Sequence, residues 1–164
     1  MEPAYVALGS NLGDRAGYML LALAELSRLP KTRLMRLSPT YETDPVGPPG
    51  QGPYLNAVIE LQSGLAPEAF LHALLAIEAK AGRKRGARWG PRTLDLDLLF
   101  FGARVLDLPG LRLPHPELHR RPFVLRPLAD LAPDLVHPVL QKTVAELLKE
   151  AGQAGVRRYV PGGA

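Results

Sequence analysis

The chain has 164 residues and a mass of 17.8 kDa, a length that predicts one domain with a core of its own. Hydrophobic residues make up 46% and charged residues 22%, values near the globular average that exclude a disordered tail, a fibrous repeat and a coiled coil. The absence of cysteine excludes disulfide bonds, thiolate metal sites and a cysteine nucleophile. We therefore expect a single globular domain over residues 1–164.

The net charge of +4 is carried mostly by arginine. Guanidinium groups match planar oxyanions with two parallel donors, which points to phosphate handling. A GC-rich genome or adaptation to heat explains the same bias, and composition alone favours that simpler explanation. The first residues show no basic segment before an apolar one, and no apolar run reaches the length of a membrane span. We expect a cytoplasmic protein with no membrane partner.

The first third of the chain predicts a strand, a helix and a second strand. The apolar run 3–9 reads as a buried strand. Asp14 stands where an N-cap is needed, ahead of a helical spacing of apolar residues over 15–29. An extended segment follows over 32–41, and the proline- and glycine-rich stretch 42–53 predicts a loop.

The rest of the chain alternates strands, helices and loops with irregular connections. Residues 54–62 predict a strand, and Pro67 begins a helix that runs to about residue 81. A loop over 82–91 leads into a strand over 93–101. The further expected elements are a hairpin return through Val105, an ordered loop over 108–122, helices over 123–131 and 143–150, and a strand over 156–160. This order indicates an α+β fold with a mostly antiparallel sheet.

Asp95 and Asp97 carry the strongest chemical signal. Residues i and i+2 of a strand share a face, so Leu94, Leu96 and Leu98 face the core and the two carboxylates lie roughly 6–7 Å apart on the other side. Two like charges held there repel unless a cation lies between them. Mg²⁺ favours such oxygen ligands together with substrate phosphates. An Asp-x-Asp pair alone is more often a solvated strand face.

The segment before this strand favours a metal site over a solvated strand face. It contains cations and no acid: Arg83, Lys84, Arg85, Arg88 and Arg92. Cations beside two metal-binding carboxylates form a clamp for a transferring phosphoryl group. A solvated basic loop and a nucleic-acid patch are the alternatives. Trp89 is either a packed hinge or a lid residue, and the glycines around it permit movement.

Several familiar catalytic motifs are absent from the sequence. It has no P-loop, no dinucleotide-binding glycine pattern, no His-Glu-x-x-His and no Gly-x-Ser-x-Gly elbow. Phosphate binding therefore falls to side chains and metal ions. Asn56 suits the edge of a flat heterocycle, with Tyr54 and Phe123 as stacking faces. Taken singly, these residues, His115 and Glu78 are at least as consistent with structural roles.

Four stretches of the chain, in order, resemble the 6-hydroxymethyl-7,8-dihydropterin pyrophosphokinase family. They are Ala7–Gly13; Tyr41–Thr43 through Tyr54–Ala57; Arg88–Leu99, with its Asp-Leu-Asp run; and Leu113–Pro116 through Arg121–Leu128. The resemblance implies a ferredoxin-like three-layer αβα sandwich on a mostly antiparallel sheet. It also implies transfer of pyrophosphate from ATP to 6-hydroxymethyl-7,8-dihydropterin, releasing AMP, in folate biosynthesis.

The resemblance also assigns roles residue by residue. Asp95 and Asp97 match the ligands of two Mg²⁺ ions, and Arg83 and Arg92 match catalytic arginines. The residues that match contacts to ATP are Glu78, Arg85, Trp89, Arg92, His115 and Arg121. Those that match the pterin pocket are Thr43, Pro45, Val46, Tyr54, Asn56, Trp89, Asp95 and Phe123.

Residues and resemblance together predict metal-assisted, in-line transfer at the β-phosphorus, by positioning and charge neutralisation. We expect a monomer that needs no nucleic acid. Two alternatives stay open: a ferredoxin-like RNA-binding module, which would show a steep salt dependence, and a two-metal phosphohydrolase, which would release orthophosphate or nucleotides.

Overall fold

The computed structural model describes residues 1–45, 51–82 and 93–160. The strands are β1 (Glu2–Ser10), β2 (Thr32–Leu37), β3 (Tyr41–Thr43), β4 (Tyr54–Ser63), β5 (Asp95–Phe101), β6 (Leu106–Leu108), β7 (Leu111–Leu113) and β8 (Val156–Arg158). The helices are α1 (Arg15–Leu26), α2 (Pro67–Lys80), α3 (Pro122–Leu131) and α4 (Val144–Ala151), with a 3₁₀ turn at Leu118–Arg120.

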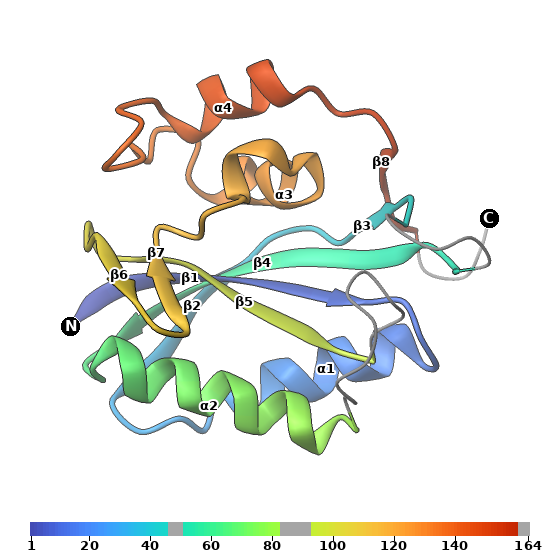
Figure 1. The fold of residues 1–164 in the computed structure, drawn as a ribbon. Coiled ribbons are helices and arrows are strands. Elements are labelled where there is room, and N and C mark those ends of the chain that lie inside the picture. The colour runs from blue at the N-terminus through green and yellow to red at the C-terminus, as the bar shows by residue number, and fades with distance from the viewer. Residues whose placement is uncertain (46–50, 83–92, 161–164) are drawn as a thin grey trace.

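A central sheet lies between two helical layers (Figure 1). Its strands run in the order β5-β1-β4-β3-β8. Strand β2 also pairs with β4, along residues 59–63, whereas β3 pairs with residues 54–56 of β4. All of the strand pairings that the described residues form in this sheet are antiparallel. The structure confirms the expected α+β fold with its helix, sheet and helix layers.

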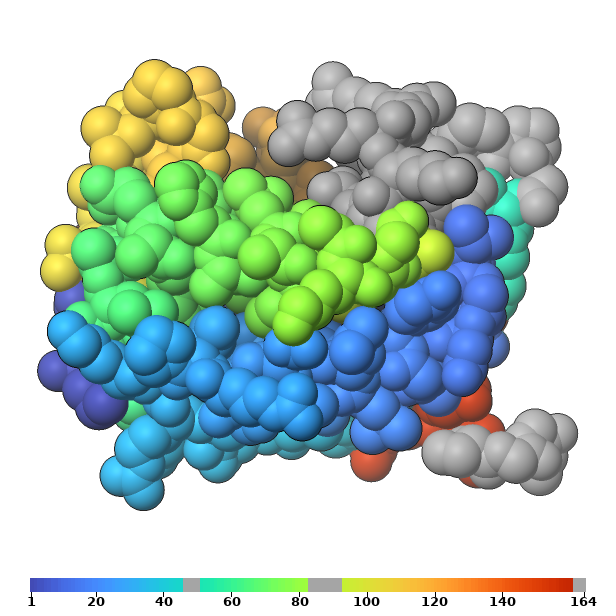
Figure 2. All heavy atoms as spheres, turned by 90° about the horizontal axis from the view of Figure 1, so that it is seen from below, coloured from blue at the N-terminus to red at the C-terminus, as the bar shows by residue number. Residues whose placement is uncertain are grey.

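Helices α1 and α2 cover one face of the sheet, and Figure 2 shows them side by side on that surface. Their apolar sides pack on the strand residues of that face, among them Val6, Leu8 and Leu96. Helices α3 and α4 cover the other face, where Val58 and Leu99 belong to a second buried cluster. Burying one such side chain contributes about 1.5–3 kcal/mol. Among the described residues, no helix is both long and apolar enough to cross a membrane.

Helix α1 begins where the sequence predicts and ends earlier. The Asp14 carboxylate accepts a hydrogen bond of 3.1 Å from the backbone N–H of Gly17, as an N-cap does. The helix ends at Leu26 rather than at residue 29. A residue before a proline is disfavoured in the helical conformation, so the chain leaves the helix ahead of Pro30.

The hairpin return expected after β5 is wrong. Strand β6 pairs with β7 in a separate two-stranded sheet, and β7 lies inside the stretch 108–122 that the sequence analysis assigned to a loop. Leu108 and Leu111 pair across Pro109 and Gly110, and Gly110 has a φ of 79°. Proline followed by a glycine at positive φ is the signature of a type II turn, so the sequence carried a signal for this hairpin.

Candidate active site

The carboxylates of Asp95 and Asp97 lie at the beginning of β5, the edge strand that pairs with β1. Asp95 pairs with Gly9 and Asp97 with Ala7, so both acids share the sheet face that α3 and α4 cover. Leu96 and Leu98 are buried on the opposite face. The alternation expected from the sequence is therefore present, and the Asp97 side chain keeps 43% of its surface exposed.

Two basic side chains approach Asp97. His115 Nε2 lies 4.0 Å from one carboxylate oxygen, and an Arg121 guanidinium nitrogen lies 4.0 Å from the other. The backbone N–H of Glu117 donates to His115 Nδ1 at 3.1 Å, which leaves Nε2 directed at Asp97. Burial lowers the pKa of His115, although the charge of Asp97 acts in the opposite direction. Arg121 also lies over the ring of Phe123, 5.8 Å from its centroid.

A cavity of about 480 Å³ opens beside the start of α3, and we call it the β8 cavity. It is lined by Thr43, Asp44, Pro45, Glu117, Arg120, Arg121, Pro122, Phe123, Ala154, Gly155 and Val156. Three of these residues, Thr43, Pro45 and Phe123, are ones that the sequence analysis placed in a pterin pocket.

A second cavity, of about 360 Å³, follows the outer edge of β5, and we call it the β5-edge cavity. It is lined by Leu71, Leu75, Glu78, Leu96, Asp97, Leu98, Leu108, Gly110, Leu111, Arg112, His115 and Pro116. Glu78, Asp97 and His115 were expected to contact ATP or its metal ions. Glu78 is buried and accepts a hydrogen bond of 2.7 Å from the backbone N–H of Leu96. A residue of helix α2 thus binds the backbone of the strand that carries Asp95 and Asp97.

The two cavities adjoin at one ion pair. Arg121 lines the β8 cavity, Asp97 lines the β5-edge cavity, and their charged groups are 4.0 Å apart. Two separate spaces with a carboxylate at their junction can hold two substrates whose reacting groups meet beside a cation.

Asn56 and Thr43 form a buried polar pair next to the β8 cavity. Asn56 Nδ2 donates to Thr43 Oγ1 at 2.6 Å, across the β3–β4 pairing. Gly9 on the neighbouring strand permits this arrangement, because a Cβ there would come within 3.0 Å of Asn56 Oδ1. Tyr54 pairs with Thr43 in the same register, so the strands bring these pterin-pocket candidates together.

Five of the expected site residues lie outside the residues that the structure describes. They are Val46, Arg83, Arg85, Trp89 and Arg92. Within the described ranges, no group of three or more His, Asp or Glu side chains is arranged to hold a metal ion. The two β5 carboxylates are an all-oxygen donor pair, which suits Mg²⁺ that completes its shell with water and substrate phosphates.

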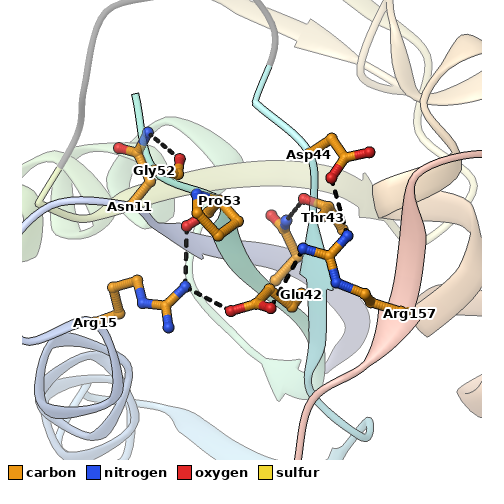
Figure 3. A network of polar contacts seen from close by, with 9 residues as sticks. Asn11, Arg15, Glu42, Thr43, Asp44, Gly52, Pro53 and Arg157 are labelled. Carbon is orange, nitrogen blue, oxygen red and sulfur yellow. Dashed lines mark hydrogen bonds and ion pairs between the residues drawn. The ribbon is translucent and has the colours of Figure 1, made fainter. Parts of the chain in front are cut away.

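The sequence analysis missed one polar network, drawn in Figure 3. Arg15, Glu42, Asp44 and Arg157 are joined by ion pairs across β3, β8 and the start of α1. The residues of β8 are more than 110 positions away from those of β3, as the Glu42–Arg157 contact shows. No local pattern could have linked them.

Comparison with known proteins identifies the family. The sequence profile described as 7,8-dihydro-6-hydroxymethylpterin-pyrophosphokinase (HPPK) matches residues 5–133. The chain belongs to this family. The 2-amino-4-hydroxy-6-hydroxymethyldihydropteridine pyrophosphokinase of Pseudomonas aeruginosa is 49% identical over 162 residues, which cover 99% of both chains. The Haemophilus influenzae protein of the same name is 42% identical over 150 residues, 92% of this chain and 93% of that one.

Solved structures of the family share the fold. The wild-type HPPK-DHPS of Plasmodium falciparum, crystallised with pteroate, superposes with a TM-score of 0.74 at 16% identity and covers 97% of this chain. This chain spans 46% of the length of that two-part protein. The expected ferredoxin-like fold and the HPPK family are therefore confirmed. Neither an RNA-binding module nor a two-metal phosphohydrolase is favoured.

Proposed function

We propose that this chain transfers the β,γ-diphosphate of ATP to the hydroxymethyl oxygen of 6-hydroxymethyl-7,8-dihydropterin, in folate biosynthesis. The observation that carries the proposal is the pair of adjoining cavities with the Asp97–Arg121 contact between them. The HPPK profile and the names of the relatives support the same chemistry.

The pterin occupies the β8 cavity in this proposal. The ring of Phe123 offers a stacking face, and Thr43 and Pro45 also line this cavity. The Asn56 side chain, already fixed by its bond to Thr43, presents an amide edge that can pair with a flat heterocycle. Tyr54 and Asp95 share the face of the sheet that carries Asn56.

The nucleotide occupies the β5-edge cavity, where Glu78 and His115 form part of the wall. Arg121 stands between the two cavities and can neutralise the diphosphate as it passes from one to the other. Arg83, Arg85, Trp89 and Arg92 lie outside the described residues, and their contacts with ATP and the transferred group stay predictions from the sequence.

Asp95 and Asp97 would hold two Mg²⁺ ions, since both carboxylates lie on one strand face and Asp97 is half-exposed at the junction. When bound, the ions draw charge from the phosphate oxygens and align the triphosphate. The hydroxymethyl oxygen of the pterin then forms a bond to the β-phosphorus, and the bond from that phosphorus to the α,β-bridging oxygen breaks. AMP leaves with that oxygen, and the hydroxyl proton passes to solvent.

We also propose that a monomer is sufficient for activity. The absence of cysteine is consistent with a reducing compartment, and we propose the cytoplasm.

The deciding experiment supplies ATP, Mg²⁺ and the reduced hydroxymethyl pterin, and identifies the products by ³¹P NMR and mass spectrometry. We expect AMP and a pterin diphosphate in equal amounts. Formation of ADP or orthophosphate, or ATP turnover that ignores the pterin, would contradict the proposal. The control is the 6-methyl pterin, which lacks the accepting hydroxyl and should yield no AMP.

A further inference from the structure

Strand β8 borders the β8 cavity although it lies beyond the part of the chain that matches the HPPK profile. The match ends at residue 133, and β8 covers Val156–Arg158. Ala154, Gly155 and Val156 line the cavity together with Thr43 and Phe123. The end of the described chain thus supplies one side of the cavity, and the residues that the family profile matches supply the rest.

Hydrogen bonds hold β8 in register against β3. Thr43 pairs with Val156 and Glu42 with Arg157, and the backbone N–H of Asp44 donates to the carbonyl of Gly155 at 3.0 Å. Successive residues of a strand point to opposite faces. Thr43 and Val156 therefore share the face of the cavity, whereas Glu42 and Arg157 lie on the reverse face with Arg15 of α1 (Figure 3).

The guanidinium of Arg157 bridges the two acids that flank Thr43. It donates to Asp44 at 2.9 Å and to Glu42 at 3.3 Å. These bonds fix the backbone on both sides of Thr43, whose hydroxyl accepts the bond from Asn56. Arg157 thus contacts one residue of the β8 cavity, Asp44, directly, and it acts on a second, Thr43, through the backbone of β3.

Arg15 ties the same acid to the far end of the connecting segment. One of its guanidinium nitrogens donates to Glu42 at 2.9 Å and to the carbonyl of Pro53 at 3.0 Å. Arg15 therefore links Glu42, in β3, to Pro53, which directly precedes β4. The hydrogen bond from Arg15 lowers the pKa of Glu42, so this carboxylate is ionised and available to both arginines at neutral pH.

We propose that Arg157 is a positioning residue for the pterin substrate, and that β8 completes the pterin pocket by bracing Thr43 from behind. This inference rests on the proposed function, because it needs the pterin in the β8 cavity. The β5-edge cavity contains no residue of β3 or β8, so binding of ATP should not depend on Arg157.

The test is steady-state kinetics of Arg157→Gln with each substrate varied in turn. We expect the KM for the pterin to rise about tenfold, while kcat and the KM for ATP stay within twofold, because one charge-assisted bridge is lost and the transfer site is untouched. Arg157→Lys should fall between Gln and the wild type, since an ammonium group is a point charge without the planar fork that spans two carboxylates.

The matched control is Arg36→Gln. Arg36 also joins a strand to a carboxylate of the neighbouring strand, Glu60, and its side chain is 53% exposed against 49% for Arg157. It lines neither cavity. This variant should show the wild-type KM for both substrates.

A double-mutant cycle tests whether Arg157 acts on the pterin KM through Glu42, so the inference does not depend on a single variant. If Arg157 acts through Glu42, the pterin KM of the double variant Glu42→Gln/Arg157→Gln should be lower than the product of the two single effects predicts. An unchanged pterin KM in Arg157→Gln, an equal rise in both KM values, or independent effects in the cycle would overturn the inference. A wild-type protein that forms no AMP with the pterin would instead refute the proposed function.

Discussion

Asp97 combines the features that a metal ligand at a transfer site needs. It is held on a sheet strand, it stays 43% exposed, and it has a guanidinium and an imidazole 4.0 Å away. The strand fixes its position, while the exposure leaves room for a cation between the carboxylate and a phosphate. Its neighbour Leu96 is buried on the reverse face, which prevents the strand from rotating.

Asp97→Asn keeps the size of the side chain and removes its charge. We expect kcat/KM with Mg²⁺ to fall about 100- to 1000-fold, since a defective metal site costs several kcal/mol and each tenfold loss corresponds to about 1.4 kcal/mol. The measurement is the rate of AMP formation across a series of Mg²⁺ concentrations. Asp134→Asn, at an exposed carboxylate that lines neither cavity, is the control and should keep the wild-type rate. Near-normal turnover of Asp97→Asn would remove the residue from the metal site.

His137 is a buried imidazole that the sequence analysis did not single out. Its Nδ1 accepts hydrogen bonds from the backbone N–H groups of Val139 and Leu140, at 3.2 and 3.0 Å. A protonated Nδ1 cannot accept them. Burial lowers the pKa of His137, with a smaller contribution from the charge of His119.

Stability should therefore fall as the pH drops below the pKa of an unfolded histidine, about 6.5. Below about pH 6.5 the histidine of the unfolded chain takes up a proton, while His137 of the folded protein stays neutral. The stability that neutral His137 contributes is therefore complete above about pH 6.5 and is lost as the pH falls toward the pKa of His137 in the folded protein. We expect His137→Asn to show a smaller decrease in the free energy of unfolding between pH 7.5 and 5.5 than the wild type, in urea titrations. His72→Asn, on an exposed position of α2, should keep the wild-type decrease. Equal pH dependence in His137→Asn and the wild type would contradict the assignment.

Helix α4 shows how a short element is stabilised at its beginning. Thr143 Oγ1 accepts the N–H of Glu146 at 3.1 Å, and the Glu146 carboxylate accepts the N–H of Thr143 at 3.0 Å. This capping box satisfies two backbone donors in a helix of eight residues. Val144, Leu147 and Leu148 then pack the helix onto the layer that also contains α3.

Thr143→Ala should lower the free energy of unfolding by about 1 kcal/mol, the usual cost of removing an N-cap side chain. Chemical denaturation at pH 7 measures it. Glu146→Gln is the control, because glutamine can make the same return bond, and it should stay within about 0.5 kcal/mol of the wild type. Turnover should be unchanged in both variants, since neither residue lines the β8 cavity or the β5-edge cavity. A loss of activity in Thr143→Ala without a loss of stability would show that α4 has a further role.

Elements with a strong periodic pattern could be predicted from the sequence, and pairings between distant segments could not. Pro67 and the helical spacing of apolar residues located α2, and alternation located β5. The β6–β7 hairpin was missed because its strands have only three residues each, too few for a period to stand out.

The whole molecule brings the site together by stacking two helical layers on one sheet. Asp97 comes from β5 at one edge, Thr43 from β3 near the other, and Arg121 and Phe123 from the approach to α3 and its first turn (Figure 1). Each cavity therefore combines residues from segments far apart in the chain, and no single motif contains a complete one.

By itself, the sequence determined the fold class, the family and which side of β5 carries the two carboxylates, because periodicity and short motifs are local properties of a chain. Only the tertiary structure decided that Arg121 lies beside Asp97, that Glu78 bonds to the backbone of β5, and that β8 closes the β8 cavity. These contacts join residues that are 18 to 115 positions apart, as the Glu78–Leu96 and Glu42–Arg157 bonds show. Such contacts form because the helices bury their apolar faces on one shared sheet, which brings distant segments of the chain next to each other. That packing depends on the entire chain.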